Sequence, residues 1–237
     1  MEKLKNLDLR GEKVLDAGTG ACGMTKRLEK ENANVVSVDV ERKRLKECRS
    51  QTKSTQFIQA DLSDLDFMAT SSFDKIICNF LVSALSESRD MIISSVLREF
   101  YRVLKDDGML IIIDYYPFED ESCPCPLDDI QVELWRLENA VAELLGEGHL
   151  QEYSPEVLLK ELKALGFQES NVSTLLEEVP WPVDLLREHE ELLRENLERV
   201  DDEKLRLPLE RKLEKIIDSA VDKQIRSGAI YELRAKK

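Results

Sequence analysis

Short apolar runs alternate with longer amphipathic stretches between residues 13 and 114. The runs are rich in β-branched residues and cover 14–16, 34–39, 56–58, 73–78 and 109–113. Strands that are almost wholly apolar are typical of parallel sheets covered by helices on both faces. The stretches between them carry apolar residues at helical spacing, over 25–31, 41–50 and 89–104. The alternation therefore predicts an α/β fold of the Rossmann type, with right-handed crossovers. Residues 61–72 predict only a turn or a short helix.

Further helices and strands are expected after residue 117. A helix over 127–145 starts near Asp128 or Asp129 and stops at Gly146. Ser154 followed by Pro155 is a helix start, with Gly166 as the matching stop. Residues 167–176 and 228–233 have the composition of two late strands.

Two apolar stripes indicate a helical pair between residues 183 and 227. Leu186, Leu193 and Val200 recur at an interval of seven residues, and a second stripe follows Pro208. The surrounding acidic and basic residues fit solvated helix faces. A seam for a partner helix is the alternative reading, so a homodimer through the helical insertions stays open.

The glycine-rich turn after the first apolar run carries the strongest functional signal. Residues 14–23 read Val-Leu-Asp-Ala-Gly-Thr-Gly-Ala-Cys-Gly, and glycine lets the backbone turn tightly and approach a ligand. Its spacing also fits a dinucleotide fingerprint. However, Asp16 stands two residues before the first glycine, where a carboxylate would repel a pyrophosphate and tolerate a cationic ligand.

Two further acidic positions fit an adenosine. Asp39 ends the second run about twenty residues after the turn, where a carboxylate can accept both ribose hydroxyls. Gln59, Ala60 and Asp61 follow the third run and can reach an adenine edge. Together these residues predict a nucleoside ligand that carries no phosphate.

At these positions the sequence resembles the class I S-adenosylmethionine-dependent methyltransferases, most closely the ubiquinone/menaquinone-biosynthesis type that acts on small molecules. Residues 14–20 resemble their first motif, 73–81 their fourth-strand motif, 100–110 the stretch before their fifth strand, and 154–167 their last sheet-flanking helix. The resemblance implies S-adenosyl-L-methionine as cofactor and a small-molecule methyl acceptor. The cofactor residues that it implies are Asp16, Gly18, Thr19, Gly20, Asp39, Val40, Ala60, Asp61, Leu62, Asn79 and Phe80.

The same resemblance implies a single domain over 1–237, built as a three-layer sandwich. Its mostly parallel seven-stranded sheet would end in an antiparallel strand at about 229–235. Two insertions, 117–150 and 183–227, exceed the family minimum and would form a helical lid over the substrate. Cys22 is a departure, because the family commonly has glycine there, and Gly23 follows at once.

Catalytic candidates are expected at strand ends and on the lid, namely Asp114, Tyr115, Tyr116 and His149. Methyl transfer needs a base only when the acceptor must lose a proton. Each candidate also has a structural reading: Asp114 can brace a loop, the tyrosines can pack under the lid, and His149 can be solvated. His189 is expected on a helix surface. The two tryptophans, 135 and 181, are expected to pack in the core or the lid, or to wall a substrate pocket.

The charge balance argues against a nucleic-acid partner. Lysine and arginine number 34 against 48 aspartate and glutamate residues, so the net charge of the 237-residue chain is −14. No apolar run reaches the roughly 20 residues of a membrane span, and the first residues lack a signal-peptide core. We therefore expect a cytoplasmic protein with reduced cysteines and no metal, and treat Cys123 and Cys125 as ordinary thiols.

Three alternatives to a small-molecule methyltransferase remain at the level of sequence. A methyltransferase of protein side chains would use the same cofactor residues. An NAD-binding dehydrogenase fits the glycine spacing but not Asp16. A non-catalytic binding module would have lost part of the cofactor site, whereas the glycines and the three acids are all present.

Overall fold

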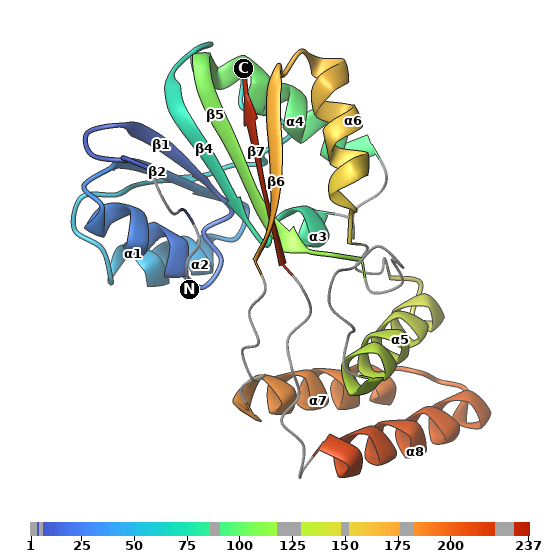
Figure 1. The fold of residues 1–237 in the computed structure, drawn as a ribbon. Helices are drawn as coiled ribbons and strands as arrows, with labels where there is room; N and C mark the ends of the chain where they lie inside the picture. Colours follow the sequence, from blue (N-terminus) through green and yellow to red (C-terminus); the bar gives the residue numbers. More distant parts are fainter. Residues whose placement is uncertain are drawn as a thin grey trace.

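A seven-stranded sheet forms the centre of the protein. The computed structural model describes residues 4, 7–85, 91–117, 129–147, 152–175, 183–220 and 230–237. The strands are β1 (Lys13–Ala17), β2 (Asn34–Asp39), β3 (Gln56–Gln59), β4 (Phe73–Asn79), β5 (Leu104–Tyr115), β6 (Glu169–Leu175) and β7 (Ile230–Lys236). They lie in the order β3-β2-β1-β4-β5-β7-β6 (Figure 1). β7 runs antiparallel to both neighbours, and the pairs from β3 to β5 are parallel. The predicted sheet and its antiparallel last strand are confirmed.

Helices cover both faces of the sheet, as the apolar strands predict. They are α1 (Gly23–Lys30), α2 (Arg42–Arg49), the short α3 (Val82–Leu85), α4 (Met91–Val103) and α6 (Pro155–Leu165). Successive strand residues point to opposite faces, so Val14 packs in the cluster with α1, whereas Leu15 packs in the cluster with α4 and α6. Ser154 caps α6 and Gly166 ends it at φ 108°, both as predicted.

β5 begins earlier than predicted, at Leu104 rather than residue 109. The added segment pairs Phe73 with Leu104 across a register shift. A Cβ at Gly108 would lie 2.7 Å from the Leu104 side chain, so glycine permits this irregular backbone to fold onto its neighbour. Residues 61–72 contain only turns and bends.

Three helices form a separate bundle, α5 (Asp129–Leu144), α7 (Val183–Glu198) and α8 (Glu203–Ala220). The bundle lies on the side where β1, β4 and β5 end (Figure 1). α8 starts five residues before Pro208, so the stripe that follows the proline continues a helix that already contains it. Pro208 lies in the second turn, where it removes only one backbone hydrogen bond.

The seven-residue stripe packs inside this bundle. Leu186, Leu193 and Val200 belong to one buried cluster with Leu134 of α5 and Leu213 of α8. The stripe is therefore used within the chain, and it offers no seam for a partner helix. A homodimer through other surfaces of the insertions stays a prediction.

One expectation about cysteines is wrong. Cys22 and Cys48 form a disulfide, with Cα atoms 5.2 Å apart. The pairing joins the turn after β1 to the last residues of α2, a contact between segments that sequence spacing does not reveal. Cys78 is a free, buried thiol, whereas Cys123 and Cys125 lie outside the described residues.

Within the described residues, no helix is both long and apolar enough to span a bilayer. The same part of the chain contains no group of three or more metal-ligating side chains.

Candidate functional site

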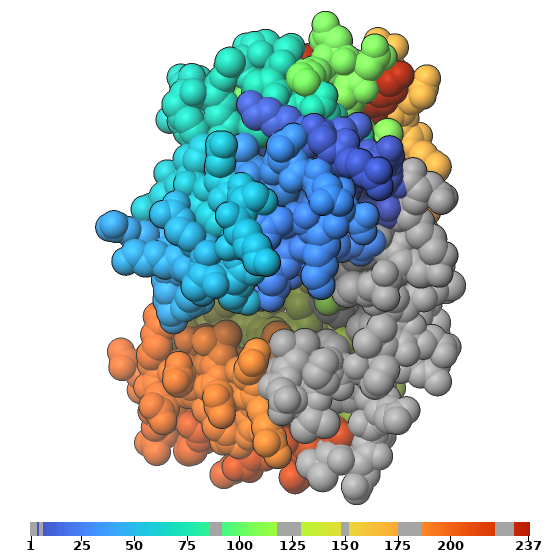
Figure 2. Space-filling view, turned by 90° about the vertical axis from the view of Figure 1, so that its left-hand side faces the viewer, coloured from blue at the N-terminus to red at the C-terminus, as the bar shows by residue number. Residues whose placement is uncertain are grey.

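A cleft of about 330 Å³ opens where β1, β2 and β4 end. Its lining consists of Gly18, Gly20, Asp39, Val40, Glu41, Arg44, Asp61, Leu62, Asn79, Phe80, Leu81, Ala84 and Leu85. Ligands of open α/β sheets bind at such carboxyl ends, where neighbouring strands send their connections to opposite faces. In Figure 2 the surface is hollowed between the blue and cyan first half of the chain and the orange α7 helix, and part of α5 lies at the back of the hollow.

The glycine turn forms one wall of the cleft. Gly18 has φ 82°, and a Cβ there would come within 3.0 Å of the Leu81 side chain. Its N–H donates to the carbonyl of Val38 at 2.9 Å, and the N–H of Gly20 donates to Oδ2 of Asp39 at 3.1 Å. A side chain at Gly18 would be strained and would fill the cleft, so this backbone is shaped to lie close to a ligand.

Asp16 lies beneath the turn rather than on the cleft lining. Its side chain is 1% exposed, and Oδ2 accepts hydrogen bonds from Thr25 Oγ1 at 2.6 Å and Ser37 Oγ at 2.9 Å. Burial raises its pKa to about 6 against the lowering effect of these bonds. Thr19 joins the same buried network through Ser37, at 2.7 Å. Oδ1 of Asp16 has no hydrogen-bond partner among the described residues.

Asn79 provides a second buried oxygen of this kind. Its Oδ1 lacks a partner within the described part of the chain. It ends β4, the strand paired with β1, where Ala17 lies opposite Cys78. Two buried acceptors at the ends of neighbouring strands carry an energetic cost unless a donor reaches them. Of the two residues, Asn79 lines the cleft, where a ligand with a hydrogen-bond donor, such as an ammonium group, can reach it.

Phe80 follows in a strained conformation. Its φ is 55°, a region that bulky residues rarely occupy, and its ring stacks on Tyr115 with centroids 4.6 Å apart. The N–H of Phe80 donates to the carbonyl of Ile113 at 2.8 Å. Strain of this kind persists where the surroundings over-determine the backbone, commonly at a binding site.

The acidic residues at the ends of β2 and β3 reach the cleft as expected. Asp39 accepts N–H groups from Gly20 and Glu41 and lines the cleft beside the exposed Val40. Asp61 and Leu62 form the opposite wall, whereas Ala60 is half-buried and does not line it.

Five lining residues were missed by sequence reasoning: Glu41, Arg44, Leu81, Ala84 and Leu85. Glu41 and Arg44 form an ion pair at 3.0 Å at the start of α2. All five lie within six residues of Asp39 or Asn79. The rule that helices start just beyond such strand ends is the signal that could have found them.

The catalytic candidates separate into different surroundings. Asp114 is buried and accepts N–H groups from Val82, Ser83 and Tyr115, so it holds the start of α3. Burial raises its pKa. Tyr116 is also buried, and its hydroxyl bonds Thr174 at 3.0 Å. These bonds give both side chains structural roles, and catalytic roles for them and for Tyr115 stay predictions.

Both histidines and both tryptophans were singled out in the sequence. His149 and Trp181 lie outside the described residues. His189 bonds Glu138 through Nδ1 at 2.6 Å, and this bond raises its pKa.

Glu152 is a titratable group that sequence reasoning missed. Burial, with the charges of Asp114 and Glu138 nearby, raises its pKa to about 7. These charges lie on β5 and α5. Nothing in the sequence around Glu152 marks it, because its surroundings come from two distant segments.

Comparison with known proteins agrees with this geometry. Residues 15–112 match the family described as "Methyltransferase domain". The chain is 31% identical over 113 residues to a ubiquinone/menaquinone biosynthesis C-methyltransferase of Wigglesworthia glossinidia brevipalpis, covering 44% of this chain and 43% of that protein. It is 33% identical over 113 residues to a demethylmenaquinone methyltransferase of Thermotoga maritima, covering 47% of each. The match thus spans less than half the length of these relatives.

Solved structures share the fold over nearly the whole chain. A SAM-dependent methyltransferase from Archaeoglobus fulgidus superposes with a TM-score of 0.60 at 15% identity, covering 97% of this chain and 88% of that one. The YcgJ protein of Bacillus subtilis gives 0.61 at 21% identity, covering 97% and 94%. The Rossmann-like methyltransferase fold and the resemblance to class I enzymes of the ubiquinone/menaquinone type are confirmed.

Proposed function

We propose that this chain, whose residues 15–112 match the methyltransferase-domain family, is an enzyme that binds S-adenosyl-L-methionine in the cleft and transfers its methyl group to a small molecule. The buried Oδ1 of Asn79, which lines the cleft and has no partner within the described residues, carries the proposal. A cofactor with an ammonium group supplies a donor to this oxygen and a positive charge above the buried acid Asp16. A dinucleotide would instead place phosphates beside the buried Asp16 carboxylate.

The remaining cleft residues suit the nucleoside part of this cofactor. Each carboxylate oxygen of Asp39 accepts one backbone N–H and keeps a lone pair for a ribose hydroxyl. Asp61 and Leu62 offer an acceptor and an apolar surface to the adenine. The turn at Gly18 and Gly20 lies against the centre of the ligand, where a side chain would collide with it.

Methyl transfer depends on the alignment of cofactor and acceptor more than on a catalytic side chain. When bound, S-adenosyl-L-methionine supplies a methyl group on a sulfonium that is already activated for in-line displacement. The protein fixes the cofactor at the strand ends and presents the acceptor from the bundle side. Phe80 lines the cleft, and its ring is held by stacking on Tyr115.

An acceptor that must lose a proton needs a base, and we propose Glu152, which does not line the cleft but has the charges of Asp114 on β5 and Glu138 on α5 nearby. Its pKa of about 7 leaves a large fraction ready to take a proton at neutral pH. Asp114 is less suited, because its oxygens hold three backbone N–H groups.

A small-molecule acceptor is supported by the names of the relatives and by the hollow between the sheet and the bundle. The acidic chain disfavours nucleic acid. We place the enzyme in the cytoplasm, where the Cys22–Cys48 disulfide would meet reducing conditions. A homodimer, if formed, uses the outer faces of the bundle, where Leu192 and Leu205 are exposed. Light scattering tests for this homodimer, and a monomer at micromolar concentration would contradict it.

A methyl-transfer assay tests the proposed function. The protein is incubated with labelled methyl donor and a small-molecule extract, and label in the organic and aqueous fractions is counted. The wild type and Asp218→Asn, an exposed acid on α8, are expected to label at equal rates. Asp16→Asn is expected to lower the rate at least tenfold. Label that appears only in protein would replace the small-molecule acceptor with a protein one.

A further inference from the structure

The segment between β3 and β4 forms a wall of the cleft without any helix or strand of its own. It covers residues 60–72, and Asp61 and Leu62 reach the cleft from it. Its internal backbone bonds are those of single turns, such as the N–H of Met68 to the carbonyl of Leu65 at 2.7 Å. A segment with so few ladder bonds needs other groups to fix its position.

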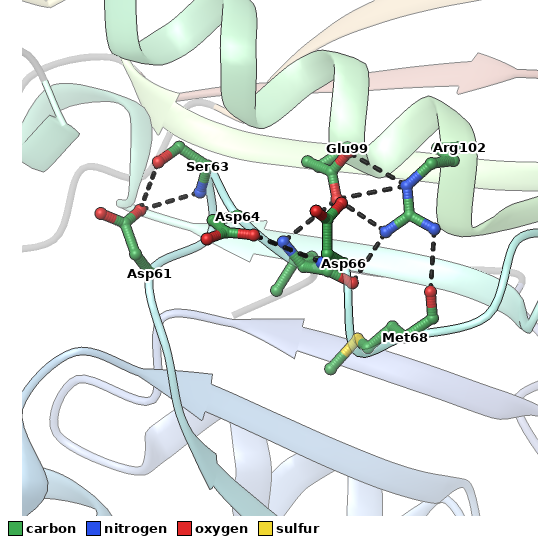
Figure 3. Close-up of polar contacts among 8 residues, drawn as sticks. Asp61, Ser63, Asp64, Asp66, Met68, Glu99 and Arg102 are labelled. Carbon is green, nitrogen blue, oxygen red and sulfur yellow. Dashed lines mark hydrogen bonds and ion pairs between the residues drawn. The ribbon is translucent and has the colours of Figure 1, made fainter.

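Arg102, in the last turn of α4, bonds the backbone of this wall directly. Nη1 donates to the carbonyl of Met68 at 2.8 Å, and Nη2 donates to the carbonyl of Leu65 at 2.7 Å. Figure 3 shows the guanidinium between Glu99 and these residues, with Asp61 and Ser63 further along the same segment. A guanidinium holds two carbonyls at a fixed separation because its N–H groups form a rigid fork.

Glu99 fixes the arginine and bonds the wall itself. Its carboxylate accepts Nε of Arg102 at 3.0 Å and Nη2 at 2.7 Å. Oε2 also accepts the backbone N–H of Leu65 at 3.1 Å. The bond from Arg102 lowers the pKa of Glu99, so the carboxylate stays charged at neutral pH. The pair thus satisfies both the N–H and the C=O of Leu65, whose side chain is fully buried.

The bonds continue from this anchor to the cleft. Oδ1 of Asp61 accepts the N–H of Ser63 at 2.8 Å and its Oγ at 2.7 Å, which folds the acid back toward the anchored part. At the far end, the N–H of Ser71 donates to the carbonyl of Arg102 at 3.0 Å. Asp61 is therefore held between β3 and a point fixed by α4.

We propose that Arg102, oriented by Glu99, is a positioning residue that sets the place of Asp61 and Leu62 and thereby the recognition of the adenine base. The inference rests on the proposed function, because it assigns the base-reading wall of that cleft. Neither residue lines the cleft, so their effect on the ligand passes through the segment that they hold.

Binding of two ligands that differ only in the base tests the proposal. Calorimetry measures the dissociation constants of S-adenosylhomocysteine and S-inosylhomocysteine, in which an oxygen replaces the 6-amino group. The wild type is expected to prefer the adenine ligand about tenfold or more, since the acceptor of Asp61 loses its donor. Arg102→Met is expected to lower the affinity for S-adenosylhomocysteine about tenfold. It is also expected to reduce the preference for the adenine ligand over the inosine ligand to about twofold.

Matched variants separate positioning from loss of stability. Arg98→Met removes an exposed arginine one turn earlier on α4 and is expected to change neither constant. Arg102→Lys retains the charge and one carbonyl bond, so it is expected to recover part of the preference. Glu99→Gln still accepts the N–H of Leu65 and is expected to lose about threefold in affinity for S-adenosylhomocysteine. Glu99→Gln and Arg102→Lys also carry the test if Arg102→Met fails to fold.

Two results would overturn the proposal. An unchanged affinity for S-adenosylhomocysteine in Arg102→Met contradicts it. So does weaker binding with the base preference retained, which would mean general loosening of the fold. Failure of the wild type to bind S-adenosylhomocysteine would instead overturn the proposed function, and this inference with it.

Discussion

Beside the cleft, two buried acids bond the backbone of other elements, whereas in the bundle of α5, α7 and α8 charged side chains pair with one another. Asp39 and Asp114 each hold backbone N–H groups of neighbouring segments. In the bundle, ion pairs such as Arg194 with Glu190 and Lys212 with Glu133 join exposed or half-buried side chains. Surface pairs of this kind contribute about 0–1 kcal/mol each.

This difference indicates that ligand specificity resides in the cleft rather than in the bundle. The bundle is stabilised by its own apolar cluster, which includes Leu134, Leu193 and Leu213, and its surface charges can change with little effect. The cleft depends on acids that define backbone positions. Substitutions in the two regions should therefore separate stability from ligand binding.

The largest expected effect is on the stability of the bundle. Leu213 is fully buried there, and Leu213→Ala is expected to lower the free energy of unfolding by about 2–5 kcal/mol. Urea denaturation followed by circular dichroism measures the loss. The affinity for S-adenosylhomocysteine should stay within twofold. Leu205→Ala, at a side chain that is 45% exposed, is the control and should cost less than about 0.5 kcal/mol. A parallel loss of affinity would show that the bundle also shapes the cleft.

Reduction of the Cys22–Cys48 disulfide should act on the sheet half alone. The bond closes a loop across 26 residues, so breaking it is expected to cost about 3 kcal/mol of stability through the unfolded chain. Thermal melts with and without dithiothreitol measure the change. The double variant Cys22→Ser with Cys48→Ser serves as control and should not respond to the reductant. Equal melting temperatures of the wild type with and without reductant would contradict a stabilising role of the disulfide.

Asp16→Asn is expected to stabilise the free protein at pH 8 while weakening its ligand. The pKa of Asp16 is about 6 in the folded chain against 3.8 for the free side chain. The folded state thus holds the proton more tightly, and the stability contributed by this group falls as pH rises from about 4 to about 6. Removing the charge should return about 1–3 kcal/mol at pH 8.

The same titration should appear in binding. The affinity of the wild type for S-adenosylhomocysteine should fall up to about tenfold per pH unit below pH 6, because the ionised acid beneath the glycine turn attracts the ammonium. In Asp16→Asn this slope should disappear. A wild-type affinity that is flat between pH 5 and 8 would contradict the role of Asp16.

The smallest effect is expected at Tyr115. Its ring stacks on Phe80, so Tyr115→Phe should keep methyl-transfer activity within about twofold, and Tyr115→Ala should lower it more. Initial rates measure both variants. A large loss in Tyr115→Phe would instead give its hydroxyl a catalytic role.

Sequence reasoning reached those parts of the site that local backbone chemistry determines. Gly18 and Gly20 follow from the turn that they must make, and Asp39, Asp61 and Asn79 from their places at strand ends. The mostly parallel seven-stranded sheet and its antiparallel β7 followed from the family resemblance and were confirmed.

Contacts between distant segments were not predictable in this way. The Cys22–Cys48 bond joins elements whose approach depends on how α2 packs. Asp16 was expected at the ligand surface, yet Thr25 and Ser37 hold it beneath the turn. The hydrogen bonds from Arg102 to the carbonyls of Leu65 and Met68 span more than thirty residues, so sequence spacing alone does not predict them.

Calorimetric titration of the wild type and Asp39→Ala with S-adenosylhomocysteine and with NAD tests the central claim most directly. We expect a micromolar dissociation constant for S-adenosylhomocysteine, a loss of at least tenfold in Asp39→Ala, and no measurable binding of NAD. Tight binding of NAD, or an affinity for S-adenosylhomocysteine that does not respond to Asp39→Ala, would contradict the assignment of the cleft.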